Sequence, residues 1–257
     1  MQLFRWYGRL ARGDLGQSIF LRRPVLEAIL DRAEPTILLT LYALVIAVVL
    51  GVPAGVIAAR HHDGTTDQAL MAGALVGISI PNFLLGLLLI LFFSVRLGWF
   101  PVAGYSPLEY GWFGTLRSLT LPAFALGVVQ SALIARIARS AMLDVLREQF
   151  IVAGRAKGLG ERAVVYKHAL KNAMIPTVTV IGISLAILIS GSVIVEQVFN
   201  IPGLGRLIIS AVLRRDYPTV LGLTVISAVV TLLASLAADL MYAAADPRVR
   251  LEGGGRR

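Results

Sequence analysis

Residues 36–59 read TILLTLYALVIAVVLGVPAGVIAA, an apolar run that contains no charged residue and ends at Arg60. A helix needs about 20 apolar residues to cross the hydrocarbon core of a bilayer, and this run is long enough. Four more apolar stretches follow, at about 68–95, about 119–135, 176–199 and 219–242. The sequence therefore predicts an all-α integral membrane protein with five transmembrane helices.

Two of these stretches have predicted irregularities. The second is longer than a bilayer requires, so we expect it to tilt or to break near Pro81. The third is expected to continue as a helix beyond the membrane. Glycines spaced four apart, at 51 and 55 and at 73 and 77, are typical of helices that pack closely in membranes.

The composition excludes several other classes of protein. Hydrophobic residues make up 57% of the chain and charged residues only 15%, which is too little charge to cover a soluble fold. The net charge of +9 does not indicate nucleic-acid binding, because the Lys and Arg lie in loops between apolar stretches. The absence of cysteine excludes disulfides, thiolate catalysis and Cys-ligated metals.

The distribution of Lys and Arg predicts the orientation. If the C-terminus is cytoplasmic, thirteen Lys and Arg face the cytoplasm and five lie in the outer loops, which agrees with the positive-inside rule. The predicted organisation is an extracytoplasmic segment 1–35, a transmembrane domain 36–242 with a cytoplasmic loop 142–174, and a cytoplasmic tail 243–257. The outer segment 1–35 adds six Arg against the rule, so we expect a first spanning helix to precede Met1 in the natural protein; a genuine five-span variant is the alternative.

Residues that could carry out chemistry are few. No lysine follows a glycine as in a phosphate-binding P-loop, and neither a G-x-S-x-G nor an H-E-x-x-H motif is present. The spans contain two acids of interest, Glu196 near the outer end of the fourth and Asp239 near the inner end of the fifth, for which a structural or gating role is expected. His61 and His62 beside Asp63 are interpreted as a polar hinge between spans, not as a metal site.

The loop 142–174 is the most informative segment. Its first part has apolar residues three and four apart from Met142 to Ala153, which predicts an amphipathic helix. Gly158-Leu159-Gly160 is expected to break it, and a second helix is expected from about Glu161 to Pro176. The apolar face of such a helix–turn–helix indicates a partner protein.

The motifs of this loop resemble those of a known family. VAGRAKGLG at 152–160 and HALKNAMIP at 168–176 resemble the coupling loop of ABC-importer permeases, in particular the branch that carries dipeptides, oligopeptides and nickel. Further similarities to that branch are GDLG at 13–16 with PV at 24–25, PGLG at 202–205 with RDYP at 215–218, and DPRVR at 246–250. The glutamate that begins the broad family's loop motif and the proline after its leucine are absent here, as Val152 and Lys171 occupy those positions.

The resemblance implies a type I ABC-importer permease fold and a non-catalytic role in transport. The coupling residues it implies are Ala153, Gly154, Ala156, Lys157, Gly158, Leu159 and Leu170. The implied partners are a second homologous permease, cytoplasmic ATP-binding subunits and an extracytoplasmic solute-binding protein in a bacterial or archaeal plasma membrane. ATP and Mg²⁺ would be used by the partner subunits, with no cofactor on this chain.

Two other classes of function are open to test. A secondary transporter commonly shows inverted repeats and charges near the midplane, and neither is visible here. A membrane enzyme would need facing polar residues within the spans. Within the ABC-permease interpretation the solute is not readable: nickel, glutathione and some oligosaccharides are carried by similar permeases, as are peptides.

Overall fold

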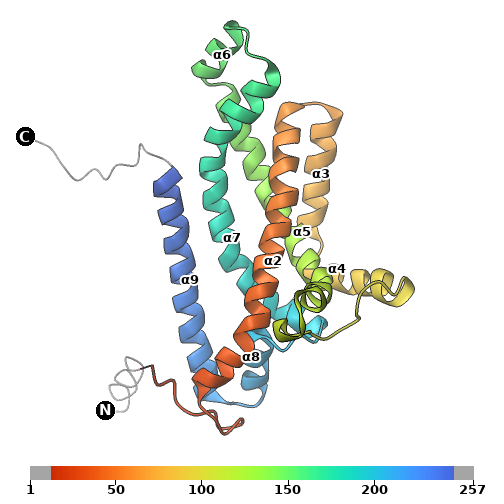
Figure 1. Cartoon of the computed structure of the whole chain (residues 1–257), viewed down its shortest axis with the longest axis vertical. Helices are drawn as coiled ribbons and strands as arrows, with labels where there is room; N and C mark the ends of the chain where they lie inside the picture. Colours follow the sequence, from red (N-terminus) through yellow and green to blue (C-terminus); the bar gives the residue numbers. More distant parts are fainter. Residues whose placement is uncertain (1–12, 246–257) are drawn as a thin grey trace, which may run out of the picture. The chain divides into compact units, whose positions relative to one another are not determined.

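The structure is a computed structural model that describes the backbone of residues 13–245 and, apart from 237–239 and 241–245, their side chains. The described chain is helical, with one isolated antiparallel bridge between Gln17 and Pro24. Figure 1 shows the four long helices: α2 (Val25–Arg60), α5 (Trp112–Leu146), α7 (Leu170–Val198) and α9 (Tyr217–Ala245). Shorter elements connect them: α3 (Thr65–Ser79), α4 (Asn82–Leu89), α6 (Gln149–Ala156), α8 (Leu204–Leu213), the π-helical η1 (Ile90–Arg96) and η3 (Ala163–Ala169), and the 3₁₀ turn η2 (Leu108–Tyr110).

Four of the five predicted spans are confirmed as helices, and the second is broken into two helical pieces. Four described helices are long and apolar enough to cross a membrane, and five spans result if α3 is counted together with α4 and η1. The expected break in the second span is present, because Ile80 leaves the helical region (φ −86°, ψ 122°) directly before Pro81. Proline disfavours helical backbone in the residue before it, which explains the position of the break.

Three helices extend well beyond their apolar runs. α2 begins at Val25, before the run at Thr36, and α7 begins at Leu170, before the run at Pro176. α5 runs from Trp112 to Leu146 around the predicted 119–135, so the expected helical continuation of the third span is confirmed. The single amphipathic helix predicted from Met142 to Ala153 is wrong. The chain forms two helices there, because Glu148 adopts extended backbone (φ −66°, ψ 146°) between α5 and α6.

The chain forms two compact units, which we describe separately. Among the described residues, the first comprises 13–42, Asn82–Leu126 and Leu188–Leu232, and the second comprises Ala43–Pro81, Gly127–Ile187 and 233–245. In the first unit, Val25 and Ile29 of α2 pack in one buried cluster with Leu207 of α8 and Leu223 of α9.

In the second unit, α2 and α5 pack through glycine, as the spacing of Gly51 and Gly55 predicts. A Cβ atom on Gly51 would lie 2.9 Å from the Ile134 side chain, and one on Gly55 would lie 2.7 Å from that of Ala138. The second predicted pair behaves differently. A Cβ on Gly73 would meet nothing within 4 Å, and one on Gly77 would only touch Ala132 at 3.9 Å. Only the first pair therefore marks a close helix contact.

Candidate coupling segment and buried acids

The segment from the end of α5 to the start of α7 is built on a buried core in the second unit. Its apolar side chains form one cluster that also includes residues of α2, and α6 contributes Ile151, which is 1% exposed. The buried members are Val56, Ala59, Ala141, Met142, Ile151, Val164, Val165, Ala169 and Ala173. An isolated helix of eight residues is unstable in water, so packing against this core stabilises α6.

α6 ends in a Schellman motif, a helix terminus closed by two backbone hydrogen bonds and a left-handed residue. The N–H of Leu159 donates to the carbonyl of Gly154 (3.2 Å), and the N–H of Gly158 donates to that of Arg155 (2.9 Å). Gly158 has φ +83°, a conformation that costs other residues about 1–2 kcal/mol. The expected helix break at 158–160 is confirmed, with Gly158 as its left-handed residue.

The exposed side chains of this segment are both apolar and basic. Phe150, Val152, Leu159 and Tyr166 are between 42% and 57% exposed, and Arg155 and Lys157 are exposed among them. Exposed apolar groups gathered on a small rigid element are typical of protein interaction sites. The arrangement therefore suits docking to another protein.

The predicted coupling residues divide into two groups. Ala153, Ala156, Lys157, Gly158 and Leu159 are exposed and Gly154 is partly exposed, so they belong to the exposed surface of the segment. Leu170 instead packs against the buried cluster and belongs to the support of the segment.

Glu196 of α7 is fully buried in the first unit, not at an interface with water. Its carboxyl group accepts hydrogen bonds from the hydroxyl of Thr36 in α2 (2.7 Å) and from the N–H of Arg206 in α8 (3.0 Å). The Thr36 hydroxyl oxygen in turn accepts from the N–H of Leu204 (2.8 Å). Glu196 therefore joins three elements and satisfies a donor in the first turn of α8.

Asp239, the second acid singled out in the sequence, lies in α9, but its side chain falls outside the described part of the structure. The DPRVR motif at 246–250 and residues 1–12 also lie outside the described residues.

Asp216, which the sequence interpretation missed, is a second buried acid of the first unit. Its carboxylate accepts from the hydroxyls of Ser18 (2.5 Å) and Thr219 (2.8 Å) and from the N–H of Ile19 (3.2 Å). Burial acts to raise the pKa of Asp216, but these hydrogen bonds outweigh it and hold the pKa below its ordinary value. The network fixes the loop 13–24 to the start of α9. The motifs GDLG and RDYP pointed to these loops but not to their contact.

His62, Asp63 and Asp67 form the one group of possible metal ligands in the described residues, with ligand atoms within 4.8 Å of one another. Arg139 of α5 engages both oxygens of the buried Asp67, with Nε 2.6 Å from Oδ1 and Nη2 2.5 Å from Oδ2. Such a bidentate pair already neutralises the carboxylate. His61 lies apart from this group and hydrogen-bonds to the carbonyl of Ile57 (3.0 Å). The geometry is that of an ion pair joining α3 to α5, in keeping with the polar-hinge interpretation.

Comparison with known proteins relates this architecture to one family. Residues 51–251 match the family described as "Binding-protein-dependent transport system inner membrane component". The oligopeptide transport system permease protein AppB of Bacillus subtilis (strain 168) is 41% identical over 252 residues, which cover 97% of this chain and 80% of that protein. The glutathione transport system permease protein GsiC of Escherichia coli O6:H1 is 41% identical over 249 residues, with 97% and 79% covered.

Solved structures show the same fold. The methionine ABC transporter MetNI in an inward-facing conformation matches with a TM-score of 0.72 at 21% identity, covering 85% of this chain and 96% of that chain. An amino acid ABC transporter crystallised with histidines matches with a TM-score of 0.63 at 20% identity, covering 84% and 94%. The fold is therefore that of a type I ABC-importer permease. Because residues 51–251 match the family and the identity to AppB covers 80% of that permease, the chain belongs to the binding-protein-dependent transport system inner membrane component family.

Proposed function

We propose that this chain is the permease subunit of an ATP-driven importer for peptides or related small solutes. Family membership supports the transport role, and relatives that carry the names of oligopeptide and glutathione permeases support the solute class. Because both relatives are equally similar, the two names together support short peptides and peptide-like solutes as a class.

The observation that carries the proposal is α6, a solvent-exposed helix that is supported by a buried core. α6 ends at the left-handed Gly158 and packs on a buried core. A partner that displaces α6 is therefore expected to move the helices packed against it as well. In this mechanism α6 and the Gly158 turn dock into a groove of a cytoplasmic ATP-hydrolysing subunit. Movement of that subunit during its ATP cycle displaces α6, and the continuous α5 and α7 carry the displacement into the membrane.

The chemistry of ATP hydrolysis belongs to the partner in this mechanism. ATP and Mg²⁺ are bound by the ATPase subunits, and this chain performs no covalent step and binds no cofactor. A second homologous permease forms the other half of the path, and an extracytoplasmic binding protein delivers the solute. The loop 142–174 and the tail from residue 243 face the cytoplasm, while residues 97–117 and 200–217 face outward.

The substitution Gly158→Val tests this mechanism. A β-branched residue resists positive φ, so the variant distorts the end of α6. We expect normal membrane insertion but loss of substrate-stimulated ATPase activity and of transport in the reconstituted complex. The matched control is Gly160→Val, because a side chain at Gly160 meets nothing within 4 Å and no positive φ is required there.

The two variants separate coupling from general damage. Gly160→Val should retain most of the wild-type coupling. If Gly158→Val couples as well as wild type, α6 and its turn do not transmit the ATP cycle. ATP-independent uptake by the chain alone in proteoliposomes would instead identify a secondary transporter.

A further inference from the structure

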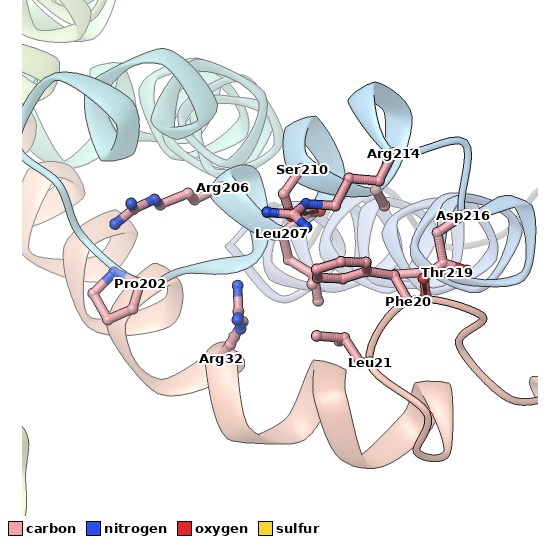
Figure 2. Close-up of a pocket in the computed structure, with 11 residues that line it drawn as sticks. Phe20, Leu21, Arg32, Pro202, Arg206, Leu207, Ser210, Arg214, Asp216 and Thr219 are labelled. Atoms are coloured by element: carbon pink, nitrogen blue, oxygen red, sulfur yellow. Dashed lines mark hydrogen bonds between the residues drawn. The ribbon is translucent and has the colours of Figure 1, made fainter.

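A pocket of about 330 Å³ lies in the first unit, between α8, the start of α2 and the loop that precedes α2 (Figure 2). None of the residues singled out for coupling or gating lines it. Its lining residues are Phe20, Leu21, Arg32, Pro202, Arg206, Leu207, Ser210, Ala211, Arg214, Asp216 and Thr219. The pocket therefore needs an explanation of its own.

Three arginines and one acid line this pocket. Figure 2 shows Arg32 on α2, Arg206 on the first turn of α8 and Arg214 beyond its end. Among the described residues, none of the three guanidinium groups makes a hydrogen bond or an ion pair; Arg214 instead stacks on the Phe20 ring, with Cζ 3.6 Å from its centroid. The lining carboxylate of Asp216 is already engaged by Ser18 and Thr219. The hydroxyls of Ser18 and Thr219 are neutral and leave the charge of Asp216 in place, so the lining carries three positive charges and one negative charge. Positive charge is therefore in excess.

The position of the pocket along the membrane normal follows from the apolar runs that end around it. Arg32 lies one helical turn before the apolar run that starts at Thr36, Arg206 follows the run that ends at Phe199, and Arg214 precedes the run that starts at Thr219. The ends of three apolar runs therefore meet at this pocket, which places it at the boundary between the hydrocarbon and the polar headgroups.

Exposed apolar side chains flank the pocket on the same elements. Phe20 is 51% exposed and also lines the pocket, Leu213 beside Arg214 is 79% exposed, and Tyr217 after Asp216 is 66% exposed. Leaving such side chains in water is unfavourable, whereas acyl chains and the interface would cover them. Positive charge beside exposed aromatic and aliphatic groups is the chemistry expected of a lipid contact.

We propose that this pocket binds the phosphodiester headgroup of an anionic phospholipid. The planar guanidinium groups of Arg32 and Arg206 suit bidentate hydrogen bonding to phosphate oxygens, and Arg214 on Phe20 provides a third cation. The acyl chains lie against the apolar rim. The bound headgroup joins α2, α8 and the loop before α2, and it balances the excess positive charge of the lining.

A phospholipid fits these observations better than an acidic partner protein. A protein partner would have to supply both an acidic group and apolar side chains that cover Leu213 and Tyr217. A phospholipid brings negative charge and hydrocarbon together at this depth. The proposal does not depend on which solute the chain transports.

Native mass spectrometry of the purified full chain in detergent tests the site, with added phosphatidylglycerol as the probe and phosphatidylcholine as the uncharged comparison. We expect preferential binding of phosphatidylglycerol, and a loss of affinity of about tenfold in each of Arg32→Gln and Arg206→Gln. The matched control is Arg96→Gln, which removes the same charge from an exposed arginine outside the pocket at the end of another apolar run. Arg96→Gln should bind like wild type.

Several outcomes would overturn the proposal. Unchanged lipid binding in Arg32→Gln and Arg206→Gln would do so, as would an equal loss in Arg96→Gln, which would reduce the effect to nonspecific interfacial charge. Equal competition by inorganic phosphate without any lipid preference would make this a free-anion site. If the pocket variants keep lipid binding but lose association with the extracytoplasmic binding protein, the occupant is an acidic protein group. Arg206→Lys keeps the positive charge but loses the bidentate guanidinium group. If the proposal is right and the variant folds normally, its affinity for phosphatidylglycerol lies between those of wild type and Arg206→Gln.

Discussion

At the scale of single residues, Glu196 is where burial and hydrogen bonding are most tightly linked. Its carboxyl group accepts from Thr36 and from the N–H of Arg206, and a glutamine there would offer one acceptor oxygen and an NH₂ group that cannot accept. We therefore expect Glu196→Gln to lower the free energy of unfolding by about 1–3 kcal/mol. Thermal unfolding of the purified chain in detergent measures this loss.

The control uses the partner of Glu196. Thr36→Val removes the hydroxyl, and Thr36→Ser retains it, so only the former should destabilise. Because Thr36 and Glu196 share one network, the double variant Glu196→Gln/Thr36→Val should lose less than the sum of the two single losses. Strict additivity, or wild-type stability of Glu196→Gln, would show that the network does not hold α8.

The sequence drew attention to Glu196 but did not predict its environment. An acid inside an apolar run is costly, which drew attention to it, but hydropathy does not reveal which distant residue will face it. Thr36 is 160 positions away and lies at the start of an apolar run, where a threonine is unremarkable. Asp216 was missed because it lies in a polar loop, where an acid carries no cost that would mark it.

At the scale of elements, α2 and α5 approach closely because Gly55 has no side chain. A Cβ atom there would lie 2.5 Å from the carbonyl oxygen of Ala135, a backbone atom that cannot move aside alone. We expect Gly55→Ala to destabilise the chain by about 1–3 kcal/mol through overpacking. Gly73→Ala in α3 should be neutral or stabilise by up to about 1 kcal/mol, because the site is open and alanine favours a helix.

Both variants replace a helical glycine by alanine. The difference between their changes in the free energy of unfolding therefore reports the packing contact at Gly55. Denaturation in detergent, followed by circular dichroism, measures both. Equal stability changes in Gly55→Ala and Gly73→Ala would mean that the α2–α5 contact is looser than it is in the structure.

Helix ends were predicted less well than helix positions. Apolar runs report how much of a helix lies in the membrane, not where the helix itself begins. The charged turns at the start of α2, with Glu27, Asp31 and Arg32, are helical although they are polar, so the predicted start was too late. The break after α5 was missed because the apolar spacing continues across Glu148, where the backbone becomes extended.

At the scale of the whole molecule, the distribution of Lys and Arg predicts which loops face the cytoplasm. Thirteen Lys and Arg fall in Arg60, the segment 136–171 and the tail, and only five lie in the loops assigned to the outside. Moving Lys and Arg across the membrane is disfavoured, so this asymmetry supports a cytoplasmic C-terminus. The six arginines of residues 1–35 oppose it, and pairing of Arg32 with a lipid phosphate would lessen that cost.

This topology can be measured directly, because the chain contains no cysteine. Single cysteines at Lys157 and Tyr110 place a probe in the coupling segment and in the loop before α5, and both positions are exposed, Tyr110 at 77%. In intact cells, a membrane-impermeant maleimide should label Tyr110→Cys. It should label Lys157→Cys only after the membrane is permeabilised. Labelling of Lys157→Cys in intact cells, with Tyr110→Cys protected, would invert the topology. It would also remove the proposed contact with a cytoplasmic ATPase, since α6 would then lie on the wrong side of the membrane.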